Sequence, residues 1–351
     1  SYQPDEVPPS LFAPHQPGVT TPVLDHLAFA ALDVIAGDGA ALRDLLTDLS
    51  AEAERLMGAA HRAPGAPGPA GSLTLTIGLG PEIFGDRFGL AARRPVALAQ
   101  LPRFPGDALD AAASGGDVCI QACAADPAAA GGALARLLAM AEPAAVLRWS
   151  QRGSMHRHEG DQPNGRPRNL LGFKDATSNP RRGRDLDRHV WIGGRDRSWM
   201  VGGTYLVVRR VRIALDAWLR LAPEEQERVI GRHRASGAPL GRRHEFDPMP
   251  LDGTVSPDAH ARIAAPQPGE APLLRRGYSF DDGVDEHGDR DAGLLLLLYQ
   301  RDPRRQFIPL QRRLAQSDAL TGYTRPVGSA IFAIPPGARP GQPLAHDLLR
   351  S

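Results

Sequence analysis

Three residues in the second half of the chain have types and surroundings that suit chemistry. Asp175 lies in "LGFKDATSNP", where Gly172 and an Asn-Pro pair are typical of a tight turn. His260 lies in "SPDAHARIAAPQ", where a polar stretch gives way to a mildly apolar one that suits the wall of a pocket. Arg275 lies in "LLRRGYSF", between an apolar pair and an aromatic strand. Because a buried arginine must be paired or face a ligand, we expect one of the two arginines in this stretch to point at an anion or a polar substrate.

None of these residues decides a function alone. A single histidine at such a position is more often structural than a metal ligand, and Arg276 replaces Arg275 if the strand register differs by one residue, because such a slip reverses the face. Together, a histidine, an acid in a tight loop and an arginine fit a haem peroxidase site, with the histidine on the iron and the other two on the opposite face. The sequence has no HExxH, CxxC, phosphate-binding glycine loop or GxSxG element, so hydrolase and nucleotide-binding functions lack their usual motifs.

Composition limits the classes of protein that remain. A chain of 351 residues allows one large core or two ordinary ones, since single cores stop growing near ~250–300 residues. The formal net charge of +1 argues against nucleic acid as a partner. The run of five leucines at residues 294–298 is far below the ~18 residues that span a bilayer, so we expect no membrane span. Cys119 and Cys123 are too few for a disulfide framework, and their spacing predicts two buried free thiols on one face of a strand.

The elements that must position the candidates follow from hydrophobic periodicity. In the first half we expect strands at 26–34, 72–80, 117–125 and 145–153, with helices at 39–58 and 128–141. In the second half we expect strands at 204–213, 293–300 and 328–337, with helices at 215–231 and 305–316, and one insertion over roughly 232–292.

Two halves with one order of elements predict an α+β fold, a tandem of duplicated ferredoxin-like units with antiparallel sheets. The expected divisions are an N-terminal arm at 1–20, wrapped over the surface, an N-terminal domain at 21–153, a linker at 154–170 and a C-terminal domain at 171–351.

The chain resembles the dye-decolourising peroxidases, most closely their exported bacterial type. "GFKDATSNP" resembles that family's distal loop, "DAHARIAAP" its proximal-histidine segment and "LLRRGYSF" its distal-arginine strand. Further similar stretches are "FAPHQPGVTTP", "GGTYLVVRRVRI", "VIGRHRASGAPLG" and "GSAIFAIPPG", and all occur in the family's order.

The resemblance implies haem b (iron protoporphyrin IX) in the C-terminal half. It makes His260 the iron ligand, Asp175 the distal acid–base residue and Arg275 its partner beside the cofactor. Arg232, in "IGRHR", matches the family arginine that contacts a haem propionate, where a guanidinium fork suits a carboxylate.

The implied activity is oxidation of dyes, phenolic or other one-electron donors by hydrogen peroxide through a ferryl intermediate. Bulky donors would pass electrons through aromatic side chains. The candidates are Trp149, Trp191, Trp199, Trp218, Tyr278, Tyr299 and Tyr323. The alternatives are a haem-binding or haem/iron-delivery protein with weak peroxidase activity, or a module that binds another porphyrin or small aromatic ligand. The family subtype suggests a secreted protein whose signal has been removed from this chain, with a cytoplasmic location and a homo-oligomer left open.

Two residues of the distal loop are unusual. Ala176 stands where the family usually has glycine, which is used where φ is positive or where the backbone must approach a ligand closely. If its φ is positive, alanine adds strain of roughly 1 kcal/mol; if its φ is negative, the methyl group only narrows the distal cavity. Lys174 is the only lysine of the chain. A local packing or charge requirement, or chance, would explain it equally well.

Overall fold

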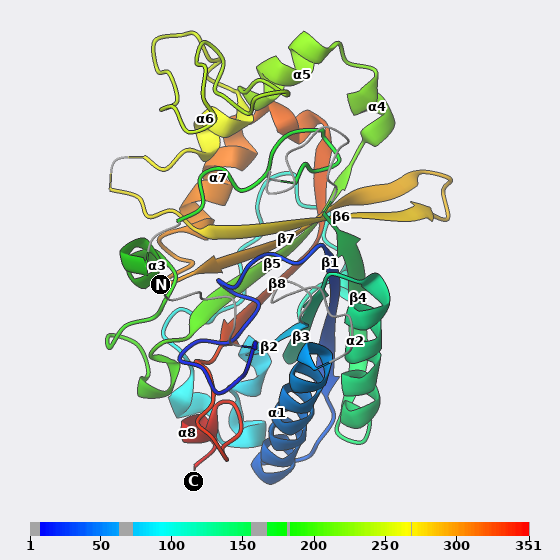
Figure 1. Cartoon of the computed structure of the whole chain (residues 1–351), viewed down its shortest axis with the longest axis vertical. Coiled ribbons are helices and arrows are strands. Elements are labelled where there is room, and N and C mark those ends of the chain that lie inside the picture. Colours follow the sequence, from blue (N-terminus) through cyan, green and yellow to red (C-terminus); the bar gives the residue numbers. More distant parts are fainter. Residues whose placement is uncertain (1–7, 63–72, 156–166, 181–182, 268, 351) are drawn as a thin grey trace.

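The first half folds in the predicted β-α-β-β-α-β order. The structure is a computed structural model, and it describes residues 8–62, 73–155, 167–180, 183–267 and 269–350 (Figure 1). The elements are β1 (His26–Val34), α1 (Gly39–His61), β2 (Thr74–Leu79), β3 (Val118–Ala124), α2 (Pro127–Ala141) and β4 (Ala145–Ser154). The strands form an antiparallel sheet in the order β4-β1-β3-β2. As predicted, Cys119 and Cys123 are free, buried thiols of one strand.

Helices α1 and α2 pack together against this sheet (Figure 1). Helix α1 begins after Asp38, whose carboxylate accepts hydrogen bonds from the backbone N–H groups of Ala40 and Ala41. Helix α2 begins after Asp126, with Pro127 in its first turn. The side chains that α1 buries recur every three or four residues, which gives it one apolar face. They include Leu42, Leu45, Leu46, Leu49, Ala53 and Met57.

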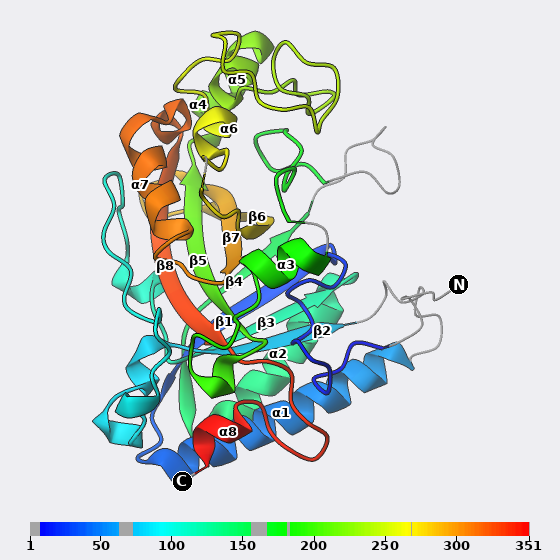
Figure 2. The same cartoon turned by 90° about the vertical axis from the view of Figure 1, so that its left-hand side faces the viewer.

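The second half repeats the same plan. Its elements are β5 (Thr204–Ile213), α4 (Leu215–Leu219), α5 (Pro223–Ile230), α6 (His260–Ala264), β6 (Leu274–Val284), β7 (Arg290–Gln300), α7 (Phe307–Ser317) and β8 (Thr324–Ile334). Their order across the sheet is β8-β5-β7-β6, which matches the first sheet strand for strand. Helices α4 to α7 lie at the end of the molecule opposite α1 and α2 (Figures 1 and 2). The ferredoxin-like duplication is therefore confirmed.

Two expectations for the second half are wrong in detail. The helix predicted over 215–231 is two helices, α4 and α5, because Pro223 lacks a backbone N–H and fits only the first turn of a helix. The insertion predicted over 232–292 is too long, since it contains α6, all of β6 and the start of β7. Its irregular part lies between α5 and α6. The predicted linker falls largely outside the described residues.

The two sheets meet at two narrow seams and close into a ring of eight strands. At one seam β2 and β8 share a single residue pair, Leu79 with Ala333, and at the other β4 and β6 share only Ser154 with Ser279. The side chain of Gln16 extends the first seam. Its amide donates to the carbonyls of residues 77 and 335, both at 3.0 Å, and accepts a hydrogen bond of 2.9 Å from the backbone N–H of residue 77.

Part of the N-terminal arm lies in the interior. Gln16 and Val19 are buried. Gly18 turns the chain with a positive φ of +91°, and a Cβ atom on this residue would lie 2.2 Å from a threonine hydroxyl. On the reverse face of β6, the Arg276 guanidinium donates to the carbonyls of Val19 and Thr21, and the Tyr278 hydroxyl donates to the carbonyl of Leu24, shortly after the arm. The arm was expected to wrap over the surface. Instead, residues 16–19 lie inside, where the carbonyl of Val19 accepts a hydrogen bond from a buried arginine of the second sheet.

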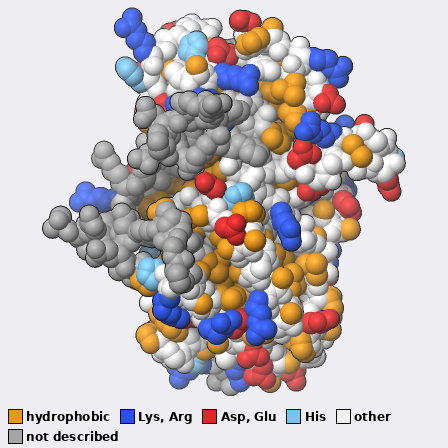
Figure 3. Space-filling model, turned by 45° about the vertical axis from the view of Figure 1, so that its right-hand side comes forward, with side chains coloured by type: hydrophobic (Ala, Val, Ile, Leu, Met, Phe, Trp, Pro, Cys, Tyr) orange, Lys and Arg blue, Asp and Glu red, His pale blue; other side chains and the backbone are white. Residues whose placement is uncertain are grey.

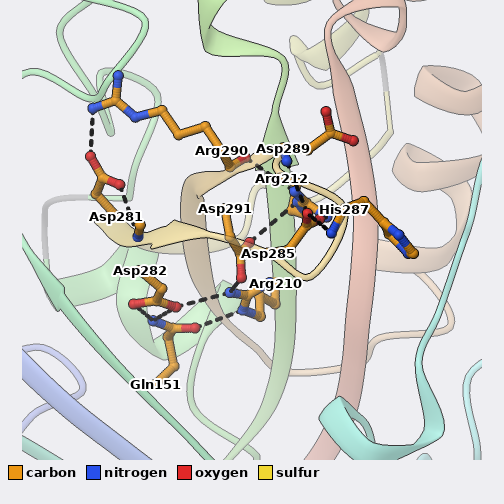
Figure 4. Close-up of polar contacts among 11 residues, drawn as sticks. Gln151, Arg210, Arg212, Asp281, Asp282, Asp285, His287, Asp289, Arg290 and Asp291 are labelled. Carbon is orange, nitrogen blue, oxygen red and sulfur yellow. Dashed lines mark hydrogen bonds and ion pairs between the residues drawn. The ribbon is translucent and has the colours of Figure 1, made fainter.

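The ends of β6 and β7 extend beyond the sheet as a charged two-stranded ribbon (Figures 1 and 4). Arg210 pairs with Asp282 at 3.0 Å and with Asp291 at 2.8 Å, and Arg212 pairs with Asp285 at 2.9 Å. These arginines offset part of the negative charge of residues 281–291. No group of three His, Cys, Asp or Glu able to hold a metal ion occurs in the described parts of the chain.

Charged side chains of both signs are also mixed over the face in Figure 3, in keeping with the small net charge. Among the described helices, none has the length and apolar character needed to cross a membrane.

Candidate active site

A large cavity opens in the second half of the molecule, between α6, α7, the inner face of β6 and β7, and the loop at 169–179. It contains about 1510 Å³ of empty space, counting the part that is open to solvent. Asp175, Arg232, His260 and Arg275, the four residues selected from the sequence, all line it. Most of the wall is apolar, as in sites that bury a large organic ligand. The apolar wall includes Phe173, Ile230, Leu294, Leu296, Leu298 and Phe307.

His260 is the first residue of α6, and Asp318 orients it. Its Nδ1 lies 2.6 Å from Oδ2 of Asp318, a buried carboxylate at the end of α7. Oδ1 of the same carboxylate accepts a 2.9 Å hydrogen bond from the backbone N–H of Leu320, which fixes its direction. Because the carboxylate accepts the Nδ1 proton, Nε2 is left as the nitrogen available to a metal. Sequence reasoning missed Asp318, which is 58 residues from its partner.

Asp175 and Arg275 form a second pair in the same cavity. The guanidinium of Arg275 donates to Oδ1 of Asp175, which also accepts a 2.6 Å hydrogen bond from the backbone N–H of Ala176. Nε of Arg275 is buried and has no hydrogen-bond partner among the described residues. A buried donor without a partner is unfavourable, so this atom indicates that the site is made for a further polar group.

The structure decides between the two neighbouring arginines. Arg275 lines the cavity, whereas Arg276 is only 3% exposed and points to the opposite face of β6, where its Nε donates to the carbonyl of Val19 at 2.9 Å. Successive side chains of a strand alternate in direction, so only one of the two can face the cavity. The expected register, with Arg275 inward, is therefore the one observed.

Asn179 joins the loop of Asp175 to the strand of Arg275. Its side-chain amide donates to the carbonyl of Arg275 at 2.7 Å, and its side-chain oxygen accepts from the backbone N–H of the same residue at 3.0 Å. This reciprocal pair fixes the backbone of the loop against β6. Sequence reasoning missed it, because the partner lies 96 residues away.

The two unusual residues of the loop now have structural explanations. Ala176 has a φ of +59°, in the left-handed region that favours glycine, so the strained alternative is the one observed. Nζ of Lys174 donates to the carbonyl of Ser236 at 3.0 Å and lies 3.3 Å from Oε2 of Glu245, whose other oxygen accepts from the hydroxyl of Thr177. Lys174 therefore attaches the distal loop to the irregular segment between α5 and α6.

Arg232 follows α5, after a glycine whose φ is +84°. One of its N–H groups donates to the carbonyls of Gly237 and Glu245, at 2.7 and 3.0 Å. Burial lowers the pKa of this guanidinium, because a buried charge loses its hydration. A ligand carboxylate beside it would offset that loss, since arginine binds carboxylates through two parallel hydrogen bonds.

These residues fit a haem. The cavity wall is apolar, as a porphyrin requires, and one imidazole is oriented to present Nε2. A buried guanidinium suits an anionic edge, and the donor without a partner at Arg275 suits a small polar ligand of the iron.

Comparisons with known proteins identify the family of the chain. Residues 16–154 match the family model described as Dyp-type peroxidase, N-terminal, and residues 166–339 match the one described as Dyp-type peroxidase, C-terminal. A dye-decolorizing peroxidase from Thermobifida fusca (strain YX) is 42% identical over 292 residues, which are 79% of this chain and 67% of the relative. A deferrochelatase from Yersinia pestis bv. Antiqua (strain Nepal516) is 36% identical over 370 residues, 97% of this chain and 84% of the relative.

Solved structures show the same fold. The oxyferrous complex of DtpA from Streptomyces lividans superimposes with a TM-score of 0.89 at 38% identity and covers 99% of this chain and 98% of its own. A DyP-type peroxidase from Cellulomonas bogoriensis has a TM-score of 0.88 at 37% identity, and the match covers both chains completely.

Proposed function

The chain belongs to the Dyp-type peroxidase family, and we propose that its peroxidase reaction takes place in the cavity lined by His260 and Asp175. As a member of this family it is a haem-dependent enzyme that uses hydrogen peroxide and electron donors. One observation carries the proposal: two separate polar pairs, His260 with Asp318 and Asp175 with Arg275, line one apolar cavity.

Each pair has its own task. Bound haem supplies the iron at which peroxide is activated and the oxidising equivalents that donors later consume. Nε2 of His260 would hold the iron, while Asp318 keeps the proton on Nδ1. The carboxylate of Asp175 takes a proton from one peroxide oxygen and delivers it to the other, a role typically worth ~10²–10⁴ in rate. The guanidinium of Arg275 stabilises the negative charge that develops as the O–O bond breaks.

Arg232 is proposed to bind a haem propionate. Among the described residues, the side chain of Arg232 hydrogen-bonds only to backbone carbonyls. No carboxylate bonded directly to it therefore balances its positive charge. A propionate would supply that charge and would fix the orientation of the cofactor in the cavity.

Dyes and other bulky donors are the proposed substrates, with electrons passing through Trp218 and Tyr323. The ring of Phe173, on the cavity wall, lies 6.4 Å from that of Trp218, which lies 5.4 Å from that of the half-buried Tyr323.

Oxidation of a tyrosine requires its phenolic proton to leave. Tyr278 and Tyr299 are fully buried and donate to amide oxygens, which are not bases, and burial raises their pKa values. They are therefore poor relays.

The experiment that tests the function is the absorption spectrum of wild type and His260→Ala after haem reconstitution, followed by one equivalent of peroxide. A haem band that changes in the variant would support His260 as the ligand, and a fast peroxide-dependent change of the wild-type band would support the reaction. If the haem absorption band of the reconstituted wild type does not change with peroxide, the proposed peroxidase reaction is contradicted. If no haem band forms, the cofactor assignment is contradicted.

A second candidate function is haem or iron handling, favoured by the name deferrochelatase that several relatives carry. Release of iron from bound haem, followed with a ferrous chelator, would distinguish it from peroxidase turnover. Export from the cell and assembly into a homo-oligomer remain predictions. Fractionation of the source cells tests the first, and light scattering of the purified protein tests the second.

A further inference from the structure

Gly277 occupies the position in β6 that faces the carboxylate of Asp175. It lies two residues after Arg275 and therefore on the same face of the strand. A Cβ atom built on Gly277 would lie 2.5 Å from Oδ2 of Asp175 and 3.5 Å from Cδ2 of Leu296. Gly277 is not among the residues with positive φ, so the backbone conformation does not require glycine here. The space does.

We propose that Gly277 is a positioning residue of the distal pair: its missing side chain makes the room in which the carboxylate of Asp175 contacts Arg275. This inference rests on the function proposed above, because it assigns Gly277 a role through Asp175. It also identifies position 277 as the place where one methyl group changes the distal chemistry while His260 and the haem-binding wall stay unchanged.

The surrounding contacts prevent the loop from making room in another way. Asn179 holds the loop against the backbone of Arg275 through two hydrogen bonds, of 2.7 and 3.0 Å. The backbone N–H of Ala176 and the guanidinium of Arg275 both donate to Oδ1 of Asp175. A methyl group at 277 pushes on Oδ2 of the same carboxylate. Because the backbone on both sides is fixed, the side chain of Asp175 must rotate, and at least one of its two hydrogen bonds to Oδ1 is lost.

The displacement has a measurable consequence. A carboxylate that moves by about 1 Å no longer lies where an incoming acid must lose its proton, and a misplacement of this size typically lowers a rate about 100-fold. Hydrogen cyanide is a suitable probe, because it gives up a proton when it binds ferric haem and needs the same base as peroxide. Its association rate reports on Asp175 without turnover.

The test uses haem-loaded wild type, Gly277→Ala, Asp175→Ala and the double variant. Gly37→Ala is the matched control, because a Cβ at Gly37 meets nothing within 4 Å. We expect Gly277→Ala to slow cyanide association about 10- to 100-fold and to alter its pH profile toward that of Asp175→Ala. The double variant should be no slower than Asp175→Ala alone, and Gly37→Ala should match wild type.

Stability supplies a second readout that does not depend on haem chemistry. Gly277→Ala should lower the melting temperature of the wild type but not that of Asp175→Ala, because the atom that it meets is then gone. This comparison holds even if Gly277→Ala alone folds poorly, since the double variant is expected to fold.

The outcomes separate the two proposals. If Asp175→Ala leaves cyanide association unchanged, the base assigned to the reaction is wrong, and the role of Gly277 falls with it. If Asp175→Ala slows association and Gly277→Ala does not, only the role of Gly277 is overturned. Additive losses in the double variant would also overturn it, because they would show that Gly277 acts independently of Asp175.

Discussion

Replacement of Ala176 by glycine should make the folded protein more stable. Ala176 has a φ of +59°, and the left-handed region costs a residue with a Cβ roughly 1–2 kcal/mol relative to glycine. Glycine also gains more freedom in the unfolded chain, which offsets roughly 0.4–1 kcal/mol of that gain. The middles of the two ranges predict that Ala176→Gly raises the free energy of unfolding by about 0.8 kcal/mol.

The assay is urea unfolding of each variant at one fixed concentration of haem, with the midpoint and slope fitted together. Ala345 provides an internal replicate, because its φ of +56° predicts a gain of the same sign for Ala345→Gly. Ala135, exposed in the middle of α2, provides the opposite control. There glycine should destabilise by about 0.8–1 kcal/mol, the ordinary difference between alanine and glycine in a helix.

Two results would refute this reasoning. If Ala176→Gly is no more stable than wild type while Ala345→Gly is, the conformation at position 176 carries no strain. The second result concerns the site. The hydrogen bond from residue 176 to Oδ1 of Asp175 comes from the backbone N–H, so glycine keeps it, and the rate of reaction with peroxide should stay close to that of wild type. A large fall would show that the methyl group itself places the carboxylate.

Three further predictions concern other parts of the molecule. Asp318→Asn should speed haem loss about 10- to 100-fold, measured by transfer to a haem-free globin, because the proximal imidazole loses its charged partner. Tyr323→Phe should slow oxidation of bulky dyes and leave the peroxide step unchanged, and equal dye rates would remove Tyr323 from the relay. Glu52 should stabilise the fold down to acid pH, because hydrogen bonds from Arg55 and Arg136 lower its pKa to about 2. The stability difference between wild type and Glu52→Gln should be constant above the usual glutamate pKa and should disappear as the pH falls through 2, as followed by unfolding at several pH values.

Local patterns in the sequence were sufficient for most of the order of elements. The choice of Arg275 over Arg276 came from the resemblance to the family, because β6 lay inside the predicted insertion. Apolar alternation located β5 at its observed bounds. The same logic failed over 215–231. There the apolar spacing of α4 and α5 is continuous, but Pro223 interrupts the backbone hydrogen bonds between them.

The parts that could not be predicted are contacts between distant segments. Asp318 and Asn179 carry no signal in their own neighbourhoods, since each acts on a residue 58 or 96 positions away. The role proposed for Gly277 likewise depends on where the loop of Asp175 lies in the folded chain. Motif similarity located the residues that would touch the cofactor, but only the folded chain shows which residues hold them in place.

The seam at Gln16 has a consequence for how the chain is made. Gln16 leaves the ribosome long before Pro335, yet one of its hydrogen bonds goes to the carbonyl of that residue, 319 positions later. The first sheet has its own helices and can fold during synthesis, as N-terminal units generally do. The ring cannot close until β8 has been synthesised. Until then, the side chain of Gln16 lacks the hydrogen bond to Pro335. A chain truncated before β8 could not close this seam. It would keep an unpaired sheet edge, to which quality-control proteins could bind.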